Sequence, residues 1–251
     1  MKLDFDTDKG IGTRATLGAI VLATDETLEP EFARMMAGEG LALYHSRIPM
    51  VPSIQPETLA EMEADLPASA RLLPSSLQFD VIGYGCTSAS TVIGSDRVAA
   101  AIQSVFPTAQ VTDPMAAIIA ACQSLGAKRL GFITPYIPSV SDRLRNKLSD
   151  AGFDITGLGS FEEGDDRVVA RITPASISAA ALHIAAQSPC DAIVISCTNL
   201  RCLSVIPAIE HQLGLPVISS NQALAWHMLR LAGVDEVQPQ FGRLFETKLA
   251  I

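Results

Sequence analysis

The sequence is poor in basic residues and has no long apolar run. Among its 251 residues, 18 Lys and Arg stand against 27 Asp and Glu, giving a formal net charge of −9. No basic run is present to displace counterions from phosphates, which argues against a nucleic-acid partner. The longest purely apolar stretch, residues 115–122, falls far short of the ~18 residues that cross a bilayer. The first ten residues carry three Asp, unlike a secretory signal. We therefore expect a cytoplasmic protein without a membrane or nucleic-acid partner.

Metal-binding and disulfide patterns are also missing. The sequence contains neither C-x-x-C nor H-E-x-x-H, and its four histidines are widely scattered, so no metal site is predicted. Five cysteines, an odd number in a chain without an export signal, predict reduced thiols rather than a disulfide framework. With 48% apolar and 18% charged residues, the composition is typical of a packed globular protein of one large domain or two small ones.

Short apolar runs alternate with longer amphipathic stretches. The runs are β-branched and bounded by Gly, Pro or polar residues, as in buried strands, and lie at residues 17–23, 81–85, 130–134, 192–196 and 216–219, with one more around Val111. Helical periodicity covers residues 56–73, 95–105, 114–125, 140–150, 175–186, 203–213 and 222–231. This alternation predicts an α/β fold of parallel sheets with right-handed crossovers.

Three pairs of similar segments recur at near-equal distances. FDVIGYGCTSAS is similar to CDAIVISCTNLR, and their cysteines, Cys86 and Cys197, lie 111 residues apart. LGAIV recurs as LGFIT 113 residues later, and two Ala-rich helical stretches end at Gly126 and Gly233, 107 residues apart. The recurrence indicates two homologous halves of about 110 residues each.

Two homologous halves predict a site between them. Equivalent strand ends would face one another across a cleft, and ligands of open parallel sheets bind at the carboxyl ends of strands. We predict two pseudo-symmetric lobes, each a mostly parallel sheet flanked by helices, with the active site between the lobes. The predicted divisions are a first lobe at 1–115 with some C-terminal residues, a second lobe at 116–230, and a tail at 231–251 that packs back on the first lobe.

The repeated Cys-Thr pair indicates chemistry on an anion. Each pair follows a predicted strand and precedes a predicted helix, where backbone N–H groups and the helix dipole favour a carboxylate. Two thiols on opposite faces of one carbon form an acid–base pair that needs no cofactor: a thiolate removes a proton and a thiol returns one. The alternative is a duplicated packing thiol, which is how we interpret Cys122, Cys190 and Cys202.

The motifs GYGCTSAS and VISCTNL resemble those of the aspartate/glutamate racemase superfamily, above all its maleate cis–trans isomerases and arylmalonate decarboxylases. The resemblance covers nearly the whole chain, including HSRIPM, GAKRLGFITPY and LGLPVISSNQA. It implies two lobes, no cofactor, a site at the lobe interface and a homodimer. Because the similar decarboxylases keep only the second cysteine, Cys86 favours the isomerase and racemase branch. The chain also resembles the branch implicated in ectoine catabolism, where an N-acetylated diaminobutyrate changes configuration.

The resemblance implies roles for individual residues. Cys86 and Cys197 match the two catalytic thiols, one of which adds to the double bond in maleate isomerases, whereas in racemases the pair exchanges the α-proton. Tyr136 matches a tyrosine that donates to the substrate carboxylate, and the polar turns after the thiols are matched by Thr87, Ser88 and Thr198. From the residue type and its place after Cys197, we expect the Asn199 amide to be a further donor.

Two acidic residues depart from the family pattern. Asp25 stands where maleate isomerases carry an asparagine, and Asp166 aligns with a second asparagine. An amide donates to a carboxylate, whereas an aspartate repels it unless the aspartate is protonated or faces a cation. We therefore hypothesise a substrate with an ammonium or similar donor that these residues receive. The alternatives are a helix N-cap for Asp25 and a solvated loop acid for Asp166.

The sequence thus predicts a cofactor-independent isomerase or racemase whose two cysteines act as an acid/base pair on a small carboxylate, with an amino acid derivative as the first choice. One alternative is a maleate cis–trans isomerase that works by cysteine addition to the double bond, or a related decarboxylase. Another is a two-lobed ligand sensor, in which loss of either thiol would barely affect binding.

Overall fold

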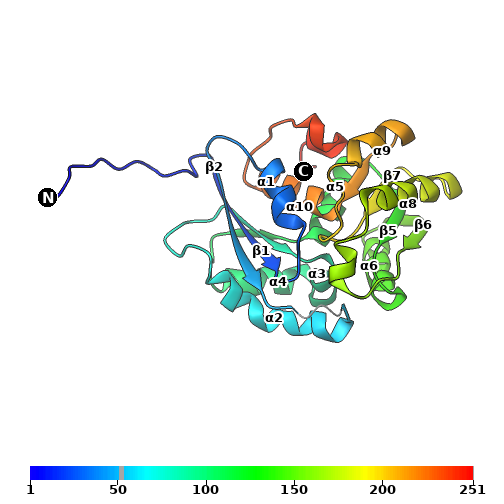
Figure 1. Cartoon of the computed structure of the whole chain (residues 1–251), viewed down its shortest axis with the longest axis horizontal. Coiled ribbons are helices and arrows are strands. Elements are labelled where there is room, and N and C mark those ends of the chain that lie inside the picture. The colour runs from blue at the N-terminus through cyan, green and yellow to red at the C-terminus, as the bar shows by residue number, and fades with distance from the viewer. Residues whose placement is uncertain (51–53, 251) are drawn as a thin grey trace.

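The computed structural model in Figure 1 describes residues 1–50 and 54–250. Two four-stranded sheets form its centre, and every strand pair in them is parallel. The first has the order β2-β1-β3-β4, from β1 (Ala15–Leu22), β2 (Leu41–Ile48), β3 (Val81–Gly85) and β4 (Gln110–Thr112). The second has the order β6-β5-β7-β8, from β5 (Arg129–Thr134), β6 (Asp154–Ser160), β7 (Ala192–Ile195) and β8 (Val217–Ser219). The second order repeats the first, which confirms the predicted fold of two pseudo-symmetric α/β lobes.

Helices cover both sheets. They are α1 (Leu28–Met35), α2 (Pro56–Ala70), α3 (Thr87–Ile93), α4 (Ser95–Gln103), α5 (Pro114–Ser124), α6 (Pro138–Asp150), α7 (Asp166–Val169), α8 (Pro174–Gln187), α9 (Ile206–Leu213) and α10 (Ser220–Leu231), followed by 3₁₀ turns at Pro239–Phe241 and Arg243–Glu246. In Figure 1, α2 and α4 lie below the first sheet, and α1 and α10 lie above it. In the second lobe α8 packs on β5 and β6, and α9 packs on β8.

Helices α5 and α10 are equivalent in the two lobes and pack against each other. Each is followed by a glycine with positive φ, Gly126 at 67° and Gly233 at 75°, the left-handed ends that their sequence repeat predicts. Helix α10 also packs over β3, where a Cβ on Gly83 would lie 2.5 Å from Met228 Sδ. The second half of the chain therefore supplies a helix to the first sheet. The divisions at 115/116 and 230/231 stay a prediction, although Gln238 of the tail donates to the Met35 carbonyl of the first lobe at 3.3 Å.

The apolar runs named in the sequence include neither β2, whose burial is mixed, nor β6, and one predicted helix begins later than expected. Helix α9 begins at Ile206 with Pro207 in its first turn, so Cys197 is followed by an irregular turn, and the predicted helix directly after it is wrong. The helix-dipole argument therefore applies to Cys86 alone. Strand β6 has no counterpart in the predicted elements, because its sequence DITGLGS is half-exposed and contains two glycines, which strands disfavour.

The aspartate of each repeat fixes the start of the neighbouring central strand. Asp80 Oδ2 accepts a hydrogen bond of 2.8 Å from the Thr16 N–H, just inside β1. Asp191 Oδ2 accepts one of 2.8 Å from the Arg129 N–H at the start of β5, and its Oδ1 accepts two from the Arg129 guanidinium. Since β1 pairs with β3 and β5 with β7, these contacts set the register of the strands that carry the two cysteines.

We predict that Asp80→Ala and Asp191→Ala lower the free energy of unfolding, Asp80→Ala by about 1 kcal/mol and Asp191→Ala by about 2, because more N–H donors lose their acceptor at Asp191. Urea denaturation at pH 7 measures the difference. The matched control is Asp150→Ala, an exposed acid at the end of α6. Equal stability of all three variants would show that the repeated aspartates do not hold the strands in register.

Candidate active site

The two repeated cysteines lie buried at equivalent strand ends. Cys86 caps α3, and its Sγ accepts a hydrogen bond of 3.3 Å from the Ala89 N–H. Cys197 follows β7, and its Sγ accepts one of 3.3 Å from the Asn199 N–H. The turns that carry them touch, because the Thr198 hydroxyl donates to the carbonyl of Gly85 at 3.4 Å. The cysteines are 1% and 4% exposed, so the site is closed to solvent.

A tyrosine stands beside each thiol. Tyr136, just after β5, is hydrogen-bonded to Cys197 and interacts electrostatically with Cys86. A single hydroxyl therefore interacts with both sulfurs. Tyr84 interacts electrostatically with Cys86, and its hydroxyl donates to Met62 Sδ at 3.7 Å. Tyr136 was predicted from the sequence, and Tyr84 was not. The signal for Tyr84 was available, because residues two apart on a strand project to the same face.

Burial raises the pKa of both thiols. It raises the pKa of Cys86 to about 12, against the Ala89 N–H and the Ser88 hydroxyl, which lower it. For Cys197 burial comes first and the charge of Asp166 second, so that its pKa lies well above the usual range despite hydrogen bonds from Tyr136 and the Asn199 N–H. At neutral pH both thiols are therefore protonated in this closed state.

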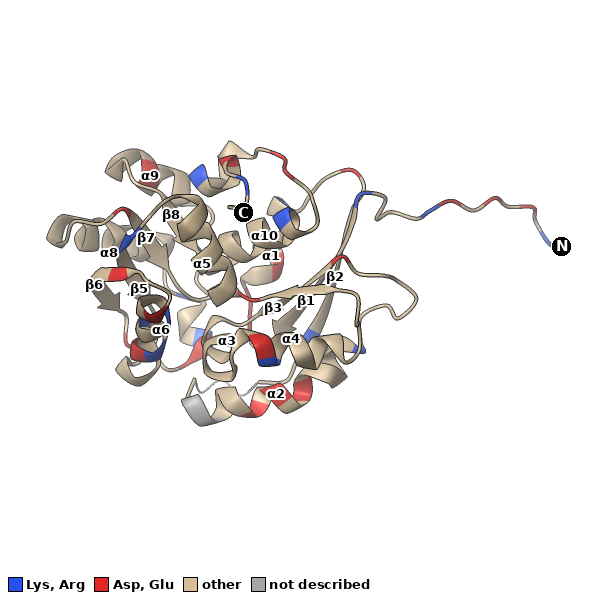
Figure 2. Cartoon of the chain, turned by 180° about the vertical axis from the view of Figure 1, so that it is seen from behind, with Lys and Arg blue, Asp and Glu red and all other residues tan. Residues whose placement is uncertain are grey.

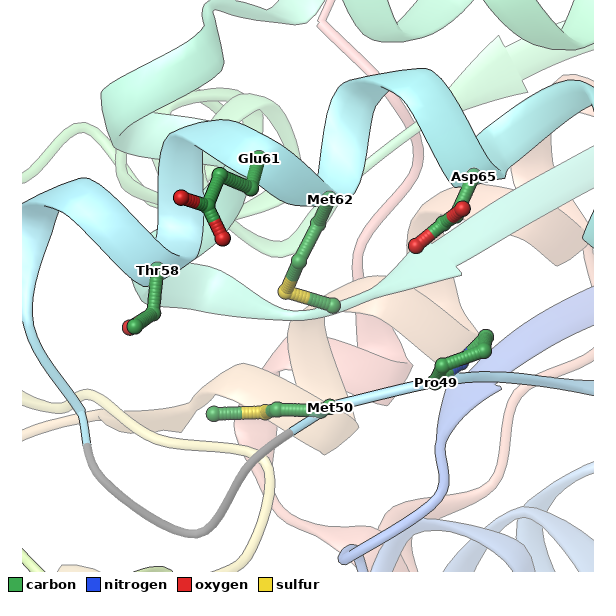
Figure 3. Close-up of a pocket in the computed structure, with 6 residues that line it drawn as sticks. All are labelled: Pro49, Met50, Thr58, Glu61, Met62 and Asp65. Atoms are coloured by element: carbon green, nitrogen blue, oxygen red, sulfur yellow. The ribbon is translucent and has the colours of Figure 1, made fainter.

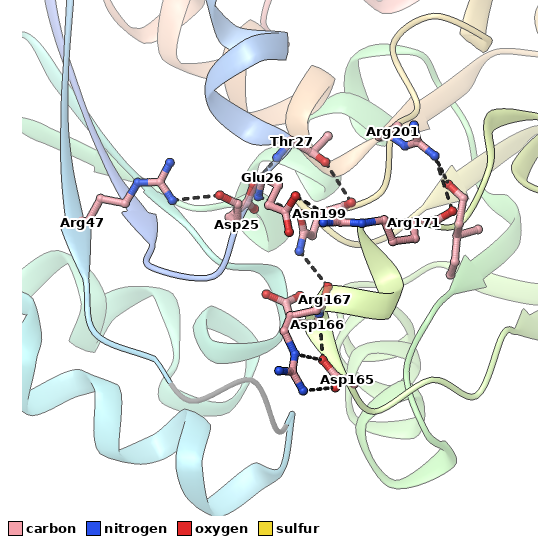
Figure 4. Close-up of polar contacts among 11 residues, drawn as sticks. Asp25, Glu26, Thr27, Arg47, Asp165, Asp166, Arg167, Arg171, Asn199 and Arg201 are labelled. Carbon is pink, nitrogen blue, oxygen red and sulfur yellow. Dashed lines mark hydrogen bonds and ion pairs between the residues drawn. The ribbon is translucent and has the colours of Figure 1, made fainter.

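The two predicted acids lie in the same buried region (Figure 4). Asp25 Oδ1 accepts hydrogen bonds of 2.8 Å from the N–H groups of Thr27 and Leu28, so Asp25 holds the turn that leads into α1, whose N-cap residue is Thr27. Its Oδ2 is buried and has no hydrogen-bond partner in the described part of the chain. Asp166 is 2% exposed and accepts a hydrogen bond of 2.5 Å from the Thr24 hydroxyl, so it is no solvated loop acid. Burial raises the pKa of both acids, and the charge of Asp166 raises that of Asp25 further.

Asn199 ties the two lobes together. Its Oδ1 accepts from the Glu26 N–H at 2.9 Å, its Nδ2 donates to the Asp166 carbonyl at 3.0 Å, and its own carbonyl accepts from the Thr27 hydroxyl at 3.0 Å. Both ends of the amide are thus bound within the protein. Asn199 positions the turn after Cys197 against the β1–α1 turn, and its predicted contact with substrate stays a prediction.

The remaining predicted residues are also buried at the lobe interface. The Thr87 hydroxyl donates to Ser220 Oγ at 2.9 Å, and Ser88 Oγ lies 3.6 Å from Cys86 Sγ. The structure therefore places the nine predicted residues in one buried region, with Ser88, Tyr136, Asp25 and Asp166 acting directly on the thiols through hydrogen bonds or charge.

Glu31 is a site neighbour that sequence reasoning missed. This buried carboxylate of α1 accepts hydrogen bonds of 2.9 Å from the Leu203 N–H and from Asn221 Nδ2, and the same Asn221 amide donates to the Thr198 carbonyl at 2.7 Å. Burial raises the pKa of Glu31 to about 7, and the charge of Asp25 adds to the rise. No sequence motif marks Glu31, because its partners lie about 170 and 190 residues further along the chain.

Neither a metal site nor a membrane span is found in the described ranges. Within residues 1–50 and 54–250, no three His, Cys, Asp or Glu side chains come together in a way that would hold a metal ion. Over the same part of the chain, no helix combines the length and apolar character that crossing a bilayer requires.

A closed pair of thiols between two parallel α/β lobes defines an enzyme of the aspartate/glutamate racemase-like type. The family model of arylmalonate decarboxylase matches residues 80–245, and the chain belongs to this family. The maleate isomerase of Pseudomonas putida is 25% identical over 91% of this chain and 96% of its own length. The arylmalonate decarboxylase of Bordetella bronchiseptica is 33% identical over 52% of this chain and 55% of its own.

A solved relative adds a chemical observation. The structure of a cysteine-to-serine variant of the Nocardia farcinica maleate cis–trans isomerase holds a covalently bound succinylcysteine intermediate. It matches this chain with a TM-score of 0.83 and 26% identity, covering 92% of this chain and 98% of its own. These relatives confirm the predicted family and the predicted isomerase class of enzyme. They are named for isomerisation of maleate and for decarboxylation, and the predicted racemase reaction is not among those names.

We predict that Glu31 makes the stability of the protein fall as the pH rises. Its pKa is about 7 in the folded protein against 4.5 ordinarily, so the folded state binds the proton more tightly. The stabilisation is fully present below about pH 4.5 and is lost as the pH passes 7, on the order of 2 kcal/mol between pH 5 and pH 8. Urea denaturation at the two pH values should show a loss that is smaller by about this amount in Glu31→Gln than in the wild type. Glu39→Gln, an exposed acid, is the control; identical slopes in all three proteins would contradict the prediction.

Proposed function

We propose that this protein is a cofactor-independent isomerase of a small carboxylate in which Cys86 and Cys197 form the catalytic pair. The observation that carries the proposal is the placement of the two thiols. They lie at equivalent strand ends in the two lobes, each within 3.3 Å of a backbone N–H, and Tyr136, hydrogen-bonded to Cys197, also interacts electrostatically with Cys86. A substrate carbon between the two sulfurs is open to attack from one side and to proton transfer from the other.

Addition to a carbon–carbon double bond is the first candidate reaction. The Cys86 thiolate adds to one alkene carbon, the π electrons move to the neighbouring carbon, and Cys197 protonates that carbon to give a saturated thioether. Rotation about the new single bond follows. Cys197 then takes a proton back, and the electron pair re-forms the double bond as the Cys86 thiolate leaves. The succinylcysteine of the Nocardia farcinica relative is the thioether that this sequence of steps produces from maleate.

The geometry favours Cys86 as the attacking thiol. Its sulfur receives the Ala89 N–H and lies beside the Ser88 hydroxyl, and both lower the pKa of Cys86, as required to stabilise a thiolate. At Cys197 the charge of Asp166 follows burial as a cause that raises the pKa, which suits a group that stays protonated and donates. A related decarboxylation would need one thiol only, so the matched pair favours isomerisation.

Racemisation of an amino acid derivative is the second candidate, and Asp25 and Asp166 are the observation that favours it. Both carboxylates are buried beside the thiols, and a dicarboxylate such as maleate would bind there only after both acids took up protons. In this reaction one sulfur removes the α-proton of the substrate and the other delivers a proton to the opposite face.

Proton NMR in D₂O separates the two reactions. The purified protein would be incubated with maleate, with aspartate and with N-acetyl-diaminobutyrate. Formation of fumarate from maleate without α-exchange in the amino acids supports addition and rotation. Deuterium at the α-carbon of an amino acid, with loss of optical activity, supports two-base racemisation.

We predict that Cys86→Ser and Cys197→Ser each reduce the turnover of whichever substrate reacts by about 10²- to 10⁴-fold, the range for loss of a proton-transfer group or nucleophile. The control is Cys190→Ser. Cys190 lies just before the start of β7, whereas Cys197 follows the end of this strand. If both active-site variants keep wild-type turnover, or if ligand binds without any turnover in the wild type, the ligand-sensor alternative replaces the enzyme.

A further inference from the structure

The start of α10 contacts the turn that follows each thiol. Ser220 Oγ accepts a hydrogen bond of 2.9 Å from the hydroxyl of Thr87, directly after the first thiol. Asn221 Nδ2 donates at 2.7 Å to the carbonyl of Thr198, directly after the second. Ser220 and Asn221 are 0% and 1% exposed, so water does not replace either contact. Two adjacent residues of one helix therefore hold both Cys-Thr turns.

These contacts are shorter than the direct contact between the two turns. The Thr198 hydroxyl reaches the Gly85 carbonyl only at 3.4 Å, beyond the usual range for an O–H donor. The bonds of Asn199 join the second turn to the β1–α1 turn and to α7, whereas Ser220 and Asn221 tie both turns to α10. With the lobes fixed against each other, α10 is thus the element that anchors each thiol turn locally.

Glu31 fixes the direction of the Asn221 amide. The two hydrogens of Nδ2 go to Glu31 Oε2 at 2.9 Å and to the Thr198 carbonyl at 2.7 Å, while Oδ1 has no hydrogen-bond partner in the described part of the chain. A reversed amide would point its oxygen at both acceptors, so only one orientation is bonded. Glu31 Oε1 in turn accepts the Leu203 N–H at 2.9 Å, which binds the carboxylate to the segment that follows the same turn.

Helix α10 is itself firmly held. Figure 2 shows it beside α5, and it also packs on α1 and β3. Its first turn carries a capping box between Ser219 and Gln222. Near its end the buried Arg230 guanidinium donates to the Val234 carbonyl at 2.7 Å, which ties the helix to the C-terminal segment. Anchors on such a helix hold a reacting group more precisely than anchors on a loop.

We propose that Ser220 and Asn221 are positioning residues for the catalytic thiols. Ser220 holds the turn of Cys86. Asn221, oriented by Glu31, holds the turn of Cys197. The inference rests on the proposed function only in taking these two cysteines as the reacting pair. A carbon between two sulfurs reacts when both lie about 3–3.5 Å from it, and a displacement of about 1 Å can cost about 10²-fold in rate.

The test needs a thiol reagent that reaches the site equally well in every variant. A solvent-facing pocket of about 240 Å³ lies between α2 and the end of β2, and Figure 3 shows Met50 and Met62 in its wall. The Tyr84 hydroxyl donates to Met62 Sδ at 3.7 Å, and Tyr84 interacts electrostatically with Cys86, so one side chain separates the pocket wall from the first thiol. Iodoacetamide is small enough to enter this pocket, and substitutions on α10 leave its lining unchanged.

Alkylation by iodoacetamide at about pH 8, read for each cysteine by peptide mass spectrometry at low conversion, measures how often each thiol turn opens. Ser220→Ala should speed alkylation of Cys86 at least about tenfold and leave Cys197 within about twofold of the wild type. Asn221→Ala should do the reverse, because it frees the other turn. Glu31→Gln should act in the same direction as Asn221→Ala, since one amide oxygen replaces two carboxylate oxygens as acceptors.

Cys122 on α5 is the control thiol in every variant, because it is buried in a helix that packs on α10. Its alkylation should stay at the wild-type rate, which shows that α10 has not moved as a whole. Ser149→Ala and Asn146→Ala, at exposed positions of α6, are the matched control variants and should react like the wild type. Any result in which Ser220→Ala and Asn221→Ala do not select different thiols, including equal acceleration at Cys122, would overturn the proposal.

Turnover shows whether the two anchors matter for the reaction. For the substrate that the NMR assay identifies, Ser220→Ala and Asn221→Ala should lower kcat about 10- to 100-fold and change KM less than about threefold, because the substrate still binds while a sulfur is misplaced. If alkylation is thiol-specific while Cys86→Ser and Cys197→Ser keep turnover, the proposed function fails. If both cysteines are essential while alkylation is not thiol-specific, or while kcat of the α10 variants is unchanged, this inference alone fails.

Discussion

The amide of Asn199 is the contact on which the rest of the site depends. It joins three segments that are far apart in the sequence, the β1–α1 turn, the turn after Cys197 and the start of α7. Because the amide is buried and both of its ends are bonded, the lobes cannot shift against one another without exposing unpaired polar groups. The relative position of the two sulfurs, the depth of Asp25 and the orientation of Asp166 all follow from this one arrangement.

Electrostatics then determine the resting state of the site. The buried region collects two thiols, two tyrosines and two carboxylates, and within the described residues no basic side chain forms an ion pair with these carboxylates. Each negative charge raises the pKa of its neighbours, so in the resting state the thiols keep their protons. A site built in this way is inert toward solvent and oxidants until a ligand changes the local charge, since the thiolate is the reactive form.

Much of this arrangement was predictable, and the parts that were not have physical reasons. The repeat with its Cys-Thr pairs predicted two similar lobes, and the two sheets have the same strand order. The nine predicted site residues lie in one buried region, because the carboxyl ends of parallel strands share one edge of a sheet. The turn after Cys197 was mistaken for a helix start, since its backbone is held by Asn199 through contacts across the lobes that local propensity does not encode. Glu31 and Asn221 were missed for the same reason. In the sequence they are ordinary polar residues, and only the tertiary structure shows that they are buried and in contact with each other.

The packing of α10 on the first sheet has a consequence for how the chain reaches its native state. Gly83 in β3 contacts Met228, so one face of the sheet formed by the first half is covered by a helix that is synthesised almost last. The first lobe leaves the ribosome with that face bare and cannot complete its core until the second lobe has been made. The duplicated halves therefore share one topology, but the packing of α10 on α5 and on β3 makes the core of the first half depend on the second.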